Sequence, residues 1–242
     1  MNPHPDPIQQ QLSQLNPRRI LDVATGRGGF IHTLVAYLPG FEEITGIDLT
    51  ASAAQAFAQA FSDPRIRFQE MDATQLEFDD QHFDLVCLAN SIHHFDRPER
   101  VLAEMLRVLR PGGTLLVLEM YRDRQSVTQL THVELHHWWA EIDTGLGITH
   151  HETFTRQEVC AQLAKLPLAN ARHFDLSDLE PDSLDPETVQ YLEKVIDLYQ
   201  QRASELPEQA RLQARGEELR QRVQQIGFHS ATALLYLAEK PE

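Results

Sequence analysis

The feature that most constrains the fold is a short apolar run that leads directly into a group of glycines, within residues 18–31. The run comprises Ile20, Leu21 and Val23, and the glycines are Gly26, Gly28 and Gly29. From Phe30 onward, apolar residues recur at helical spacing. This change of period predicts a buried strand, a tight turn and a helix. In an open α/β sheet, such a turn lies at the carboxyl end of a strand, where ligands bind.

A dinucleotide-binding turn is the first alternative. Its fingerprint is G-x-G-x-x-G, and Gly26 and Gly28 supply the first two glycines, but the third position is occupied by Ile31. Many strand-to-helix turns need glycine only because it adopts positive φ. The glycine turn alone therefore does not identify the ligand, and the residues at the ends of the later strands are needed to do so.

Two acidic residues end further predicted strands. Asp48 closes the strand expected at 43–48 and lies 22 residues after Gly26, where a carboxylate can accept hydrogen bonds from ribose hydroxyls. Asp72 follows the strand expected from residue 66, where it can accept from an adenine amino group while Ala73 leaves room for the ring. The alternatives are a helix N-cap for Asp48 and a loop cap for Asp72.

The next segments extend the alternation of strands and helices. A fourth strand is expected at 83–89, an amphipathic helix at 97–110 and a fifth strand at 114–119. Strands that alternate with helices of this length indicate a parallel sheet with right-handed crossovers. The sequence therefore predicts an α/β fold.

Composition limits the partners. The chain has 36 acidic and 21 basic residues among 242, a formal net charge of −15, which disfavours nucleic acid and anionic membranes as partners. No apolar run is long enough to cross a bilayer, and no secretory leader is evident. The two cysteines, Cys87 and Cys160, are interpreted as reduced thiols. We therefore expect a cytoplasmic protein.

Five short motifs now occur in order. They are Leu21-Asp-Val-Ala-Thr-Gly-Arg-Gly, Gly46-Ile-Asp-Leu, Met71-Asp-Ala, Phe83-Asp-Leu-Val and Leu109-Arg-Pro-Gly-Gly. With these motifs, residues 18–121 resemble the class I S-adenosylmethionine-dependent methyltransferases. The family has glycine where this chain has Ala24, a change that adds one methyl group to the turn.

The resemblance implies a Rossmann-like seven-stranded sheet with its last strand antiparallel. With the helical patterns in the rest of the chain, the predicted fold has helices on both faces of this sheet and helical lid insertions. The resemblance also implies S-adenosyl-L-methionine as the cofactor, bound along the carboxyl edge of the first four strands. Asp22 would lie near its amino group, and Asn90 and Ser91 beside the transferred methyl. The full set of implied cofactor contacts is Asp22, Ala24, Gly26, Gly28, Asp48, Leu49, Asp72, Ala73, Asn90 and Ser91.

His93 and His94 follow the fourth strand and are the candidate catalytic residues. Methyl transfer from a sulfonium needs mainly in-line positioning, but an oxygen or nitrogen acceptor must also lose a proton. A histidine with a pKa near neutrality can take that proton. The alternative is that the two rings pack against the backbone and line the acceptor pocket.

The region 123–152 is rich in histidine. His132 and His136 share one face of a predicted helix, and Asp143 and His150 follow closely. One hypothesis is a metal site in which His132 and His136 are ligands, helped by a carboxylate. The other is a lid over the acceptor pocket with tryptophans packed inside it. The other candidate ligands are Glu141, His151 and Glu152, and the tryptophans are Trp138 and Trp139.

The predicted organisation is a tail and flap helix at 1–17 and a methyltransferase domain at 18–242, with helical additions at 123–152 and 186–226. The second addition is expected to break near Pro207 and to serve as a lid, a homodimer contact or a surface hairpin. The predicted function is methyl transfer to a small-molecule acceptor. The alternatives are a metal-assisted methyltransferase and a non-catalytic protein that binds S-adenosylmethionine or S-adenosylhomocysteine.

Overall fold

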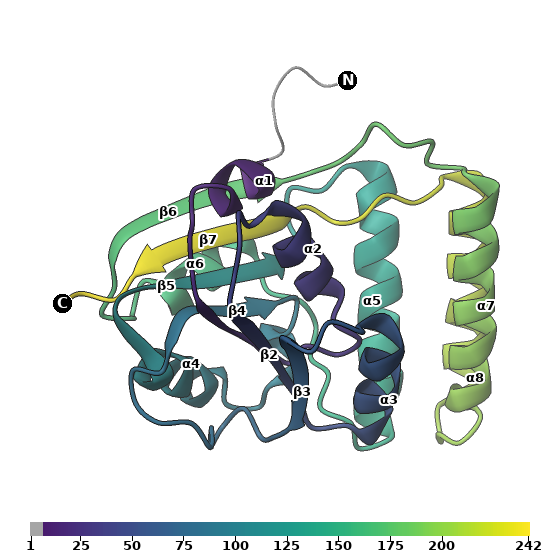
Figure 1. Ribbon diagram of the computed structural model, residues 1–242. Helices are drawn as coiled ribbons and strands as arrows, with labels where there is room; N and C mark the ends of the chain where they lie inside the picture. The colour runs from purple at the N-terminus through teal and green to yellow at the C-terminus, as the bar shows by residue number, and fades with distance from the viewer. Residues whose placement is uncertain (1–6) are drawn as a thin grey trace.

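The structure, a computed structural model that describes residues 7–242 apart from the side chains of residues 51 and 52, is built on a seven-stranded sheet (Figure 1). The strand order is β3-β2-β1-β4-β5-β7-β6. The strands are β1 Arg19–Val23, β2 Glu43–Asp48, β3 Ile66–Glu70, β4 Phe83–Ala89, β5 Leu109–Met120, β6 Ala169–Leu176 and β7 Ala233–Glu239. The last strand, β7, is antiparallel to both its neighbours, and the pairs among β1–β5 are parallel. This confirms the predicted sheet.

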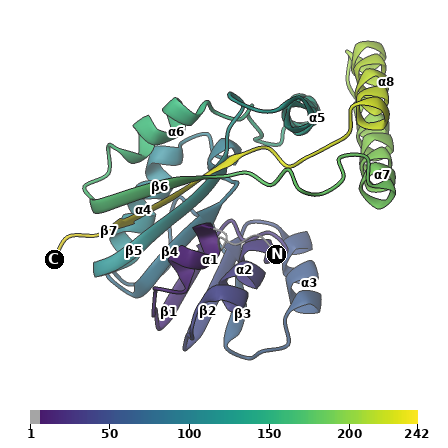
Figure 2. The ribbon, with the colours of Figure 1, turned by 90° about the horizontal axis from the view of Figure 1, so that it is seen from above.

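Helices cover both faces of the sheet, as expected for an α/β fold (Figure 2). They are α1 Pro7–Leu12, α2 Gly29–Tyr37, α3 Ala51–Ala60, the 3-10 turn η1 Ile92–His94, α4 Pro98–Val108, α5 Val127–Gly145, α6 Arg156–Leu163, α7 Pro186–Ala203 and α8 Gln209–Gln225. None of the helices in residues 7–242 is long and apolar enough to span a membrane.

Each face of the sheet has its own apolar core. Ile20 packs with α1, α2 and α3, whereas the next residue, Leu21, packs with α4 and α6 on the opposite face. Successive side chains of a strand point to opposite faces, so a run of consecutive apolar residues is what a strand covered on both sides requires. The cores hold the carboxyl ends of β1–β4 at one edge.

A third apolar core joins α5 to the hairpin of α7 and α8, which lies beside α5 and away from the sheet (Figures 1 and 2). Trp138 of α5 is buried there, and its indole N–H donates to the Leu212 carbonyl at 3.0 Å. Gly216 of α8 permits this packing, because a Cβ atom there would lie 2.7 Å from the Trp138 ring. The break between the two helices falls at residues 204–208, around Pro207.

Three predicted boundaries differ from the structure. The helix expected at 97–110 ends at Val108 because Leu109 is already extended, so β5 begins at Leu109 and not at 114. The helix expected from 123 begins at Val127, after a capping box of Ser126 and Gln129. Of the tail and flap helix expected at 1–17, the structure shows the helix α1 at Pro7–Leu12, and residues 1–6 lie outside the described residues.

Candidate functional site

The carboxyl ends of β1–β4 surround a cavity of about 670 Å³. Its lining contains eight of the ten residues predicted to contact a cofactor: Ala24, Gly26, Asp48, Leu49, Asp72, Ala73, Asn90 and Ser91. Ile148 and Thr149, which follow α5, complete the wall. Asp22 and Gly28 are not in the lining. Gly28 instead faces Phe61, so close that a Cβ atom at Gly28 would clash with the ring.

The turn after β1 requires positive φ angles at several residues. Ala24, Gly26 and Gly28 all have positive φ, at 53°, 52° and 82°. Glycine adopts this region freely, but a residue with a Cβ atom is strained there by about 1–2 kcal/mol. The turn is therefore as tight as the resemblance implies, and Ala24 bears the strain.

Ala24→Gly is expected to raise the free energy of unfolding by about 0.5–1 kcal/mol, since relief of this strain exceeds the entropy that glycine adds to the unfolded chain. Urea unfolding followed by circular dichroism measures it. Ala58→Gly, on the exposed side of α3, is the matched control and should lose about 1 kcal/mol. A loss of stability at both positions would contradict the strain at Ala24.

Asp22 is buried at the end of β1 with one oxygen unpaired. Its Oδ2 accepts a hydrogen bond from Thr25 Oγ1 at 2.6 Å, but Oδ1 has no hydrogen-bond partner in the described residues. Burial raises the pKa of Asp22 to about 7, against the Thr25 hydrogen bond and with the help of the Asp48 charge. An unpaired buried acceptor beside a ligand cavity fits a donor such as an ammonium group.

Asp48 connects the turn to the next helix. Its Oδ2 accepts from the Gly26 N–H at 3.0 Å, and its Oδ1 accepts from the N–H and hydroxyl of Thr50 at 3.2 and 3.1 Å. Thr50 itself caps α3, since its hydroxyl accepts from the Ala53 N–H at 3.3 Å. Asp48 is therefore held in one orientation at the cavity and is not the N-cap of the helix.

Asp72 caps the loop that follows it, which was the alternative to a role in adenine binding. Its Oδ1 accepts a hydrogen bond from the Thr74 N–H at 2.7 Å. The side chain is nevertheless exposed in the cavity lining, next to the small side chain of Ala73. Both carboxylates thus lie at one edge of the sheet, as neighbouring parallel strands require.

Asn90 separates this cavity from a second one of about 730 Å³. It has a φ of 48°, in the left-handed region that asparagine tolerates, and its side-chain oxygen accepts from the Met120 N–H at 3.0 Å. The second cavity lies between α1, the ends of β4 to β7 and α5. Its lining is Pro7, Asn90, Leu118, Met120, His132, Asp175, Leu176, Ser177, Asp178, Leu179, Glu180, Ser230, Ala231 and Ala233.

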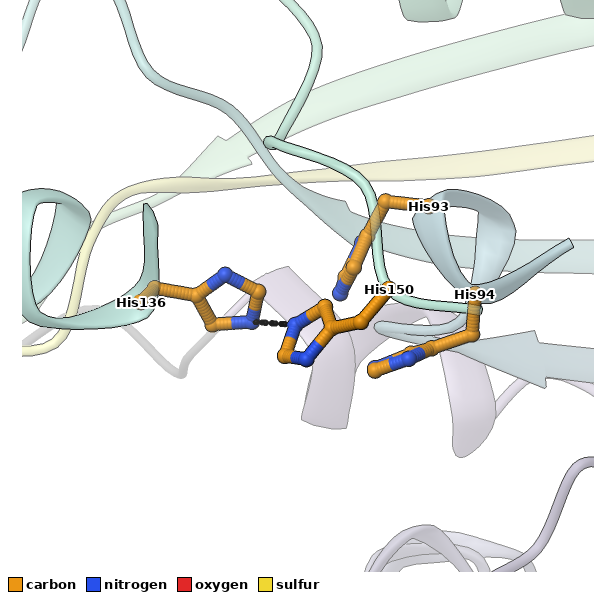
Figure 3. Close-up of side chains that lie close together, drawn as sticks. All are labelled: His93, His94, His136 and His150. Carbon is orange, nitrogen blue, oxygen red and sulfur yellow. Dashed lines mark hydrogen bonds between the residues drawn. The ribbon is translucent and has the colours of Figure 1, made fainter. Parts of the chain in front are cut away.

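Four histidines meet beside the first cavity, which one of them lines, and Figure 3 shows how their rings lie. They are His93 and His94 of η1, His136 of α5 and His150 of the following loop, and one ring nitrogen from each lies within 4.8 Å of the others. His94 is exposed and lines the cavity, whereas the other three are buried. The structure therefore brings together both candidate catalytic histidines and two of the candidate metal ligands.

Two buried carboxylates orient this cluster. The Nδ1 atom of His93 is paired with Glu119 of β5, which also accepts from the N–H groups of Ser91 and Ile92 at 3.0 and 3.1 Å. The Nδ1 atom of His150 lies 2.7 Å from Asp143 Oδ2. Sequence reasoning missed Glu119, although a single carboxylate at the end of an apolar strand is a signal that could have found it.

Two histidines of the cluster, His94 and His136, have lowered pKa values. The His94 side chain is exposed where it lines the cavity, and partial burial of its ring, together with His93 and His150, lowers its pKa to about 3. Burial with the same neighbours lowers the pKa of His136 still further. A general base works best when its pKa is near the working pH. These shifts favour neutral rings as nitrogen donors, and the catalytic role of His93 and His94 stays a prediction.

The structure does not bring the two residues of the metal hypothesis, His132 and His136, into one cluster. His132 lies outside the cluster, because its Nδ1 atom accepts from the Ala231 N–H at 2.9 Å and its ring centroid lies 6.2 Å from that of His136. Burial lowers the pKa of His132 to about 4. The remaining candidate ligands face other partners: Glu141 pairs with Arg211, Glu152 lies 3.9 Å from His137, and His151 lies 3.2 Å from Asp96.

Comparison with known proteins gives a consistent result. Residues 21–117 match a family model described as a methyltransferase domain. A demethylmenaquinone methyltransferase of Thermus thermophilus is 42% identical over 106 residues, covering 43% of this chain and 47% of that protein. A demethylmenaquinone methyltransferase of Porphyromonas gingivalis is 34% identical over 110 residues, covering 44% and 45%. The chain thus matches less than half the length of these relatives.

A solved structure extends the likeness to the whole chain. The crystal structure of the YcgJ protein from Bacillus subtilis superposes with a TM-score of 0.59 and 20% identity, over 97% of this chain and 98% of that one. At this identity the likeness shows the fold alone. It confirms the Rossmann-like fold that the motifs imply.

Proposed function

Since the chain carries a class I S-adenosylmethionine-dependent methyltransferase domain, we propose that it transfers the methyl group of S-adenosylmethionine to a neutral or cationic small molecule. The observation that carries this proposal is the pair of cavities that meet at Asn90. The first has the carboxyl-edge location and the residues expected for the cofactor. The second is of similar volume and adjoins the position where the methyl would lie.

The cofactor assignment follows from the shape and charge of the first cavity. The unpaired Asp22 oxygen suits the ammonium group of the methionyl part. Asp48 is oriented to accept from the ribose, and Asp72 with Ala73 suits the adenine. A cofactor held in this way would direct its sulfonium toward Asn90. When bound, it supplies an electrophilic methyl group, and the chain's own contribution is to align an acceptor with it.

The charged residues that line the second cavity limit the class of acceptor molecule that it can bind. Its described lining includes three acidic residues (Asp175, Asp178 and Glu180) and no lysine or arginine, and Asp175 is paired with Arg156 from outside the lining at 2.7 Å. An anionic acceptor would be repelled there, whereas an amine, a phenol or an uncharged ring would not. The relatives named demethylmenaquinone methyltransferases support an uncharged aromatic acceptor. The match to the methyltransferase-domain model ends at residue 117, before most of this lining, so the cavity is the stronger guide.

The proposal is tested by measuring S-adenosylhomocysteine release with matched acceptor pairs. Amines and phenols should be methylated, and their carboxylated or phosphorylated analogues should react at least tenfold more slowly. Tight cofactor binding without product from any acceptor would favour the non-catalytic alternative. Faster reaction of the anionic analogues would overturn the acceptor class but not methyl transfer.

Binding of S-adenosylhomocysteine is expected to weaken by about tenfold as the pH falls from 8 to 6. The pKa of Asp22 is raised to about 7 in the ligand-free protein, so the carboxyl becomes neutral in this range and no longer attracts the ammonium group. Calorimetry in buffers of different ionisation enthalpy measures both the affinity and the proton released on binding.

Asp22→Asn is the matched control for this pH dependence. It should bind weakly at pH 8 and show a flat profile between pH 6 and 8, because the amide does not titrate. A wild-type profile as flat as that of the variant would contradict the assignment of Asp22 to the ammonium group.

A further inference from the structure

The histidine cluster contains two buried nitrogen atoms without a hydrogen-bond partner among the described residues, His93 Nε2 and His136 Nδ1. His93 is 1% exposed, and its Nε2 atom has no hydrogen-bond partner among the described residues. Figure 3 shows its ring turned toward those of His136 and His150. A buried polar atom without a partner is unfavourable by about 1–3 kcal/mol, so it calls for a ligand.

The carboxylates fix which nitrogen carries the lone pair. A carboxylate only accepts hydrogen bonds, so Glu119 and Asp143 require the Nδ1–H groups of His93 and His150 to donate to them. With a single proton on each ring, at Nδ1, the Nε2 atoms of His93 and His150 present lone pairs to the centre of the cluster. A ligating histidine whose other nitrogen donates to a carboxylate is the usual arrangement around a protein-bound metal.

The spacing fits a metal better than a hydrogen bond. The Nε2 atoms of His136 and His150 are 3.4 Å apart, which is long for a hydrogen bond between two rings. Two nitrogens at about 2.05 Å from one zinc ion, at the tetrahedral angle, lie about 3.3 Å apart. The whole set lies within 4.8 Å, so the remaining rings need to move by about 1–1.5 Å to complete a tetrahedron.

We propose that His93, His136 and His150 bind a divalent transition-metal ion through their Nε2 atoms, with His94 as an exchangeable fourth ligand. The donor set is all imidazole, which suits zinc, iron, cobalt or nickel and not calcium or magnesium. This site is independent of the proposed methyl transfer, because it is defined by the nitrogens and carboxylates of the chain itself.

We assign His94 as the exchangeable ligand because it is less buried than the other three histidines. His94 is the exposed member of the cluster and lines the cofactor cavity, whereas the other three rings are enclosed. Three protein ligands and one open position are typical of metal sites that bind a substrate. An oxygen donor in the cavity, such as a hydroxyl, enolate or carboxylate, is the ligand class that the open side would take.

The test uses the full chain with a tag that contains no histidine, stripped with a chelator and titrated with Zn²⁺ or Co²⁺ against a chromogenic competitor. We expect one ion per chain with a submicromolar Kd, and a higher melting temperature in the presence of Zn²⁺. His136→Gln and His150→Gln should each weaken binding at least 100-fold, and His94→Ala by no more than about tenfold. The visible spectrum of the Co²⁺ form reports nitrogen coordination.

Two further variants make the test specific. His151→Gln, which changes the exposed neighbour of His150, should bind the ion as the wild type does. Glu119→Gln should weaken binding 10–100-fold while the protein stays folded, because the amide N–H turns His93 Nδ1 into an acceptor and places the proton on Nε2. A folded wild type that binds neither ion below 10 μM, or equal losses in the His151 and His150 variants, would overturn the proposal. Equal losses in the His94 and His150 variants would overturn the exchangeable position.

Discussion

Asp48→Ala is expected to weaken S-adenosylhomocysteine binding by about 1.5–3 kcal/mol, roughly 10–150-fold, because hydrogen bonds from the ribose to a charged acceptor are lost. The carboxylate lines the cavity and is already oriented by Gly26 and Thr50, so little ordering is needed when the ligand binds. Isothermal titration calorimetry at pH 8, where Asp22 is largely ionised, measures the change.

The matched control is Glu70→Ala. Glu70 pairs with Asp48 in the register of β2 and β3, but it is not in the cavity lining. Its removal should leave the affinity unchanged. Asp48→Asn retains an acceptor for the Gly26 N–H and should fall between wild type and alanine. Unchanged affinity in Asp48→Ala, with the variant folded, would contradict the ribose assignment.

Glu119→Leu is expected to lower the free energy of unfolding by about 3–5 kcal/mol. Glu119 is 0% exposed, and its carboxylate accepts from two backbone N–H groups and from His93. Leucine has a similar size but no acceptor, so three buried donors would lose their partner. Urea unfolding gives the free energy, provided that the slope with urea is unchanged.

Glu119→Gln separates hydrogen bonding from size and charge. Its side-chain oxygen can still accept from Ser91 and Ile92, so we expect a loss of only about 1 kcal/mol. If glutamine and leucine were equally destabilising, the charge of Glu119, and not its acceptor geometry, would hold η1 in place.

The sheet could be predicted largely from the sequence, because the strands β1, β2 and β4 are short and buried on both faces. Residues 83–89 form a short and mostly apolar run, which is typical of a central strand, and the structure has β4 at these residues. The start of β5 was less predictable. Leu109 continues the helical spacing of α4, and its extended conformation is set by pairing with Phe83 across the sheet.

The positions of Asp48 and Asp72 were also predictable, since the ends of adjacent parallel strands meet at one edge. The histidine cluster was not. His132 and His136 share a helix face, but His132 is engaged elsewhere. Its Nδ1 atom accepts a hydrogen bond from the N–H of Ala231, about 100 residues away in the sequence. Meanwhile His93 and His150 are brought together by the path of the loop after α5, in which the His151 N–H donates to the His93 carbonyl at 2.8 Å. Sequence spacing reports neither contact.

The hairpin of α7 and α8 also contacts a residue that orients the histidine cluster. Tyr199 and Arg202 of α7 both contact Asp143, at 3.2 and 2.7 Å, and Asp143 in turn fixes the ring of His150. Burial and the Asp143 charge raise the pKa of Tyr199 to about 12, so its hydroxyl remains a donor. Substitutions of Tyr199 or Arg202 would thus change the orientation of the buried His150 ring through Asp143, so the histidine cluster can be adjusted from a helix that lies away from the sheet.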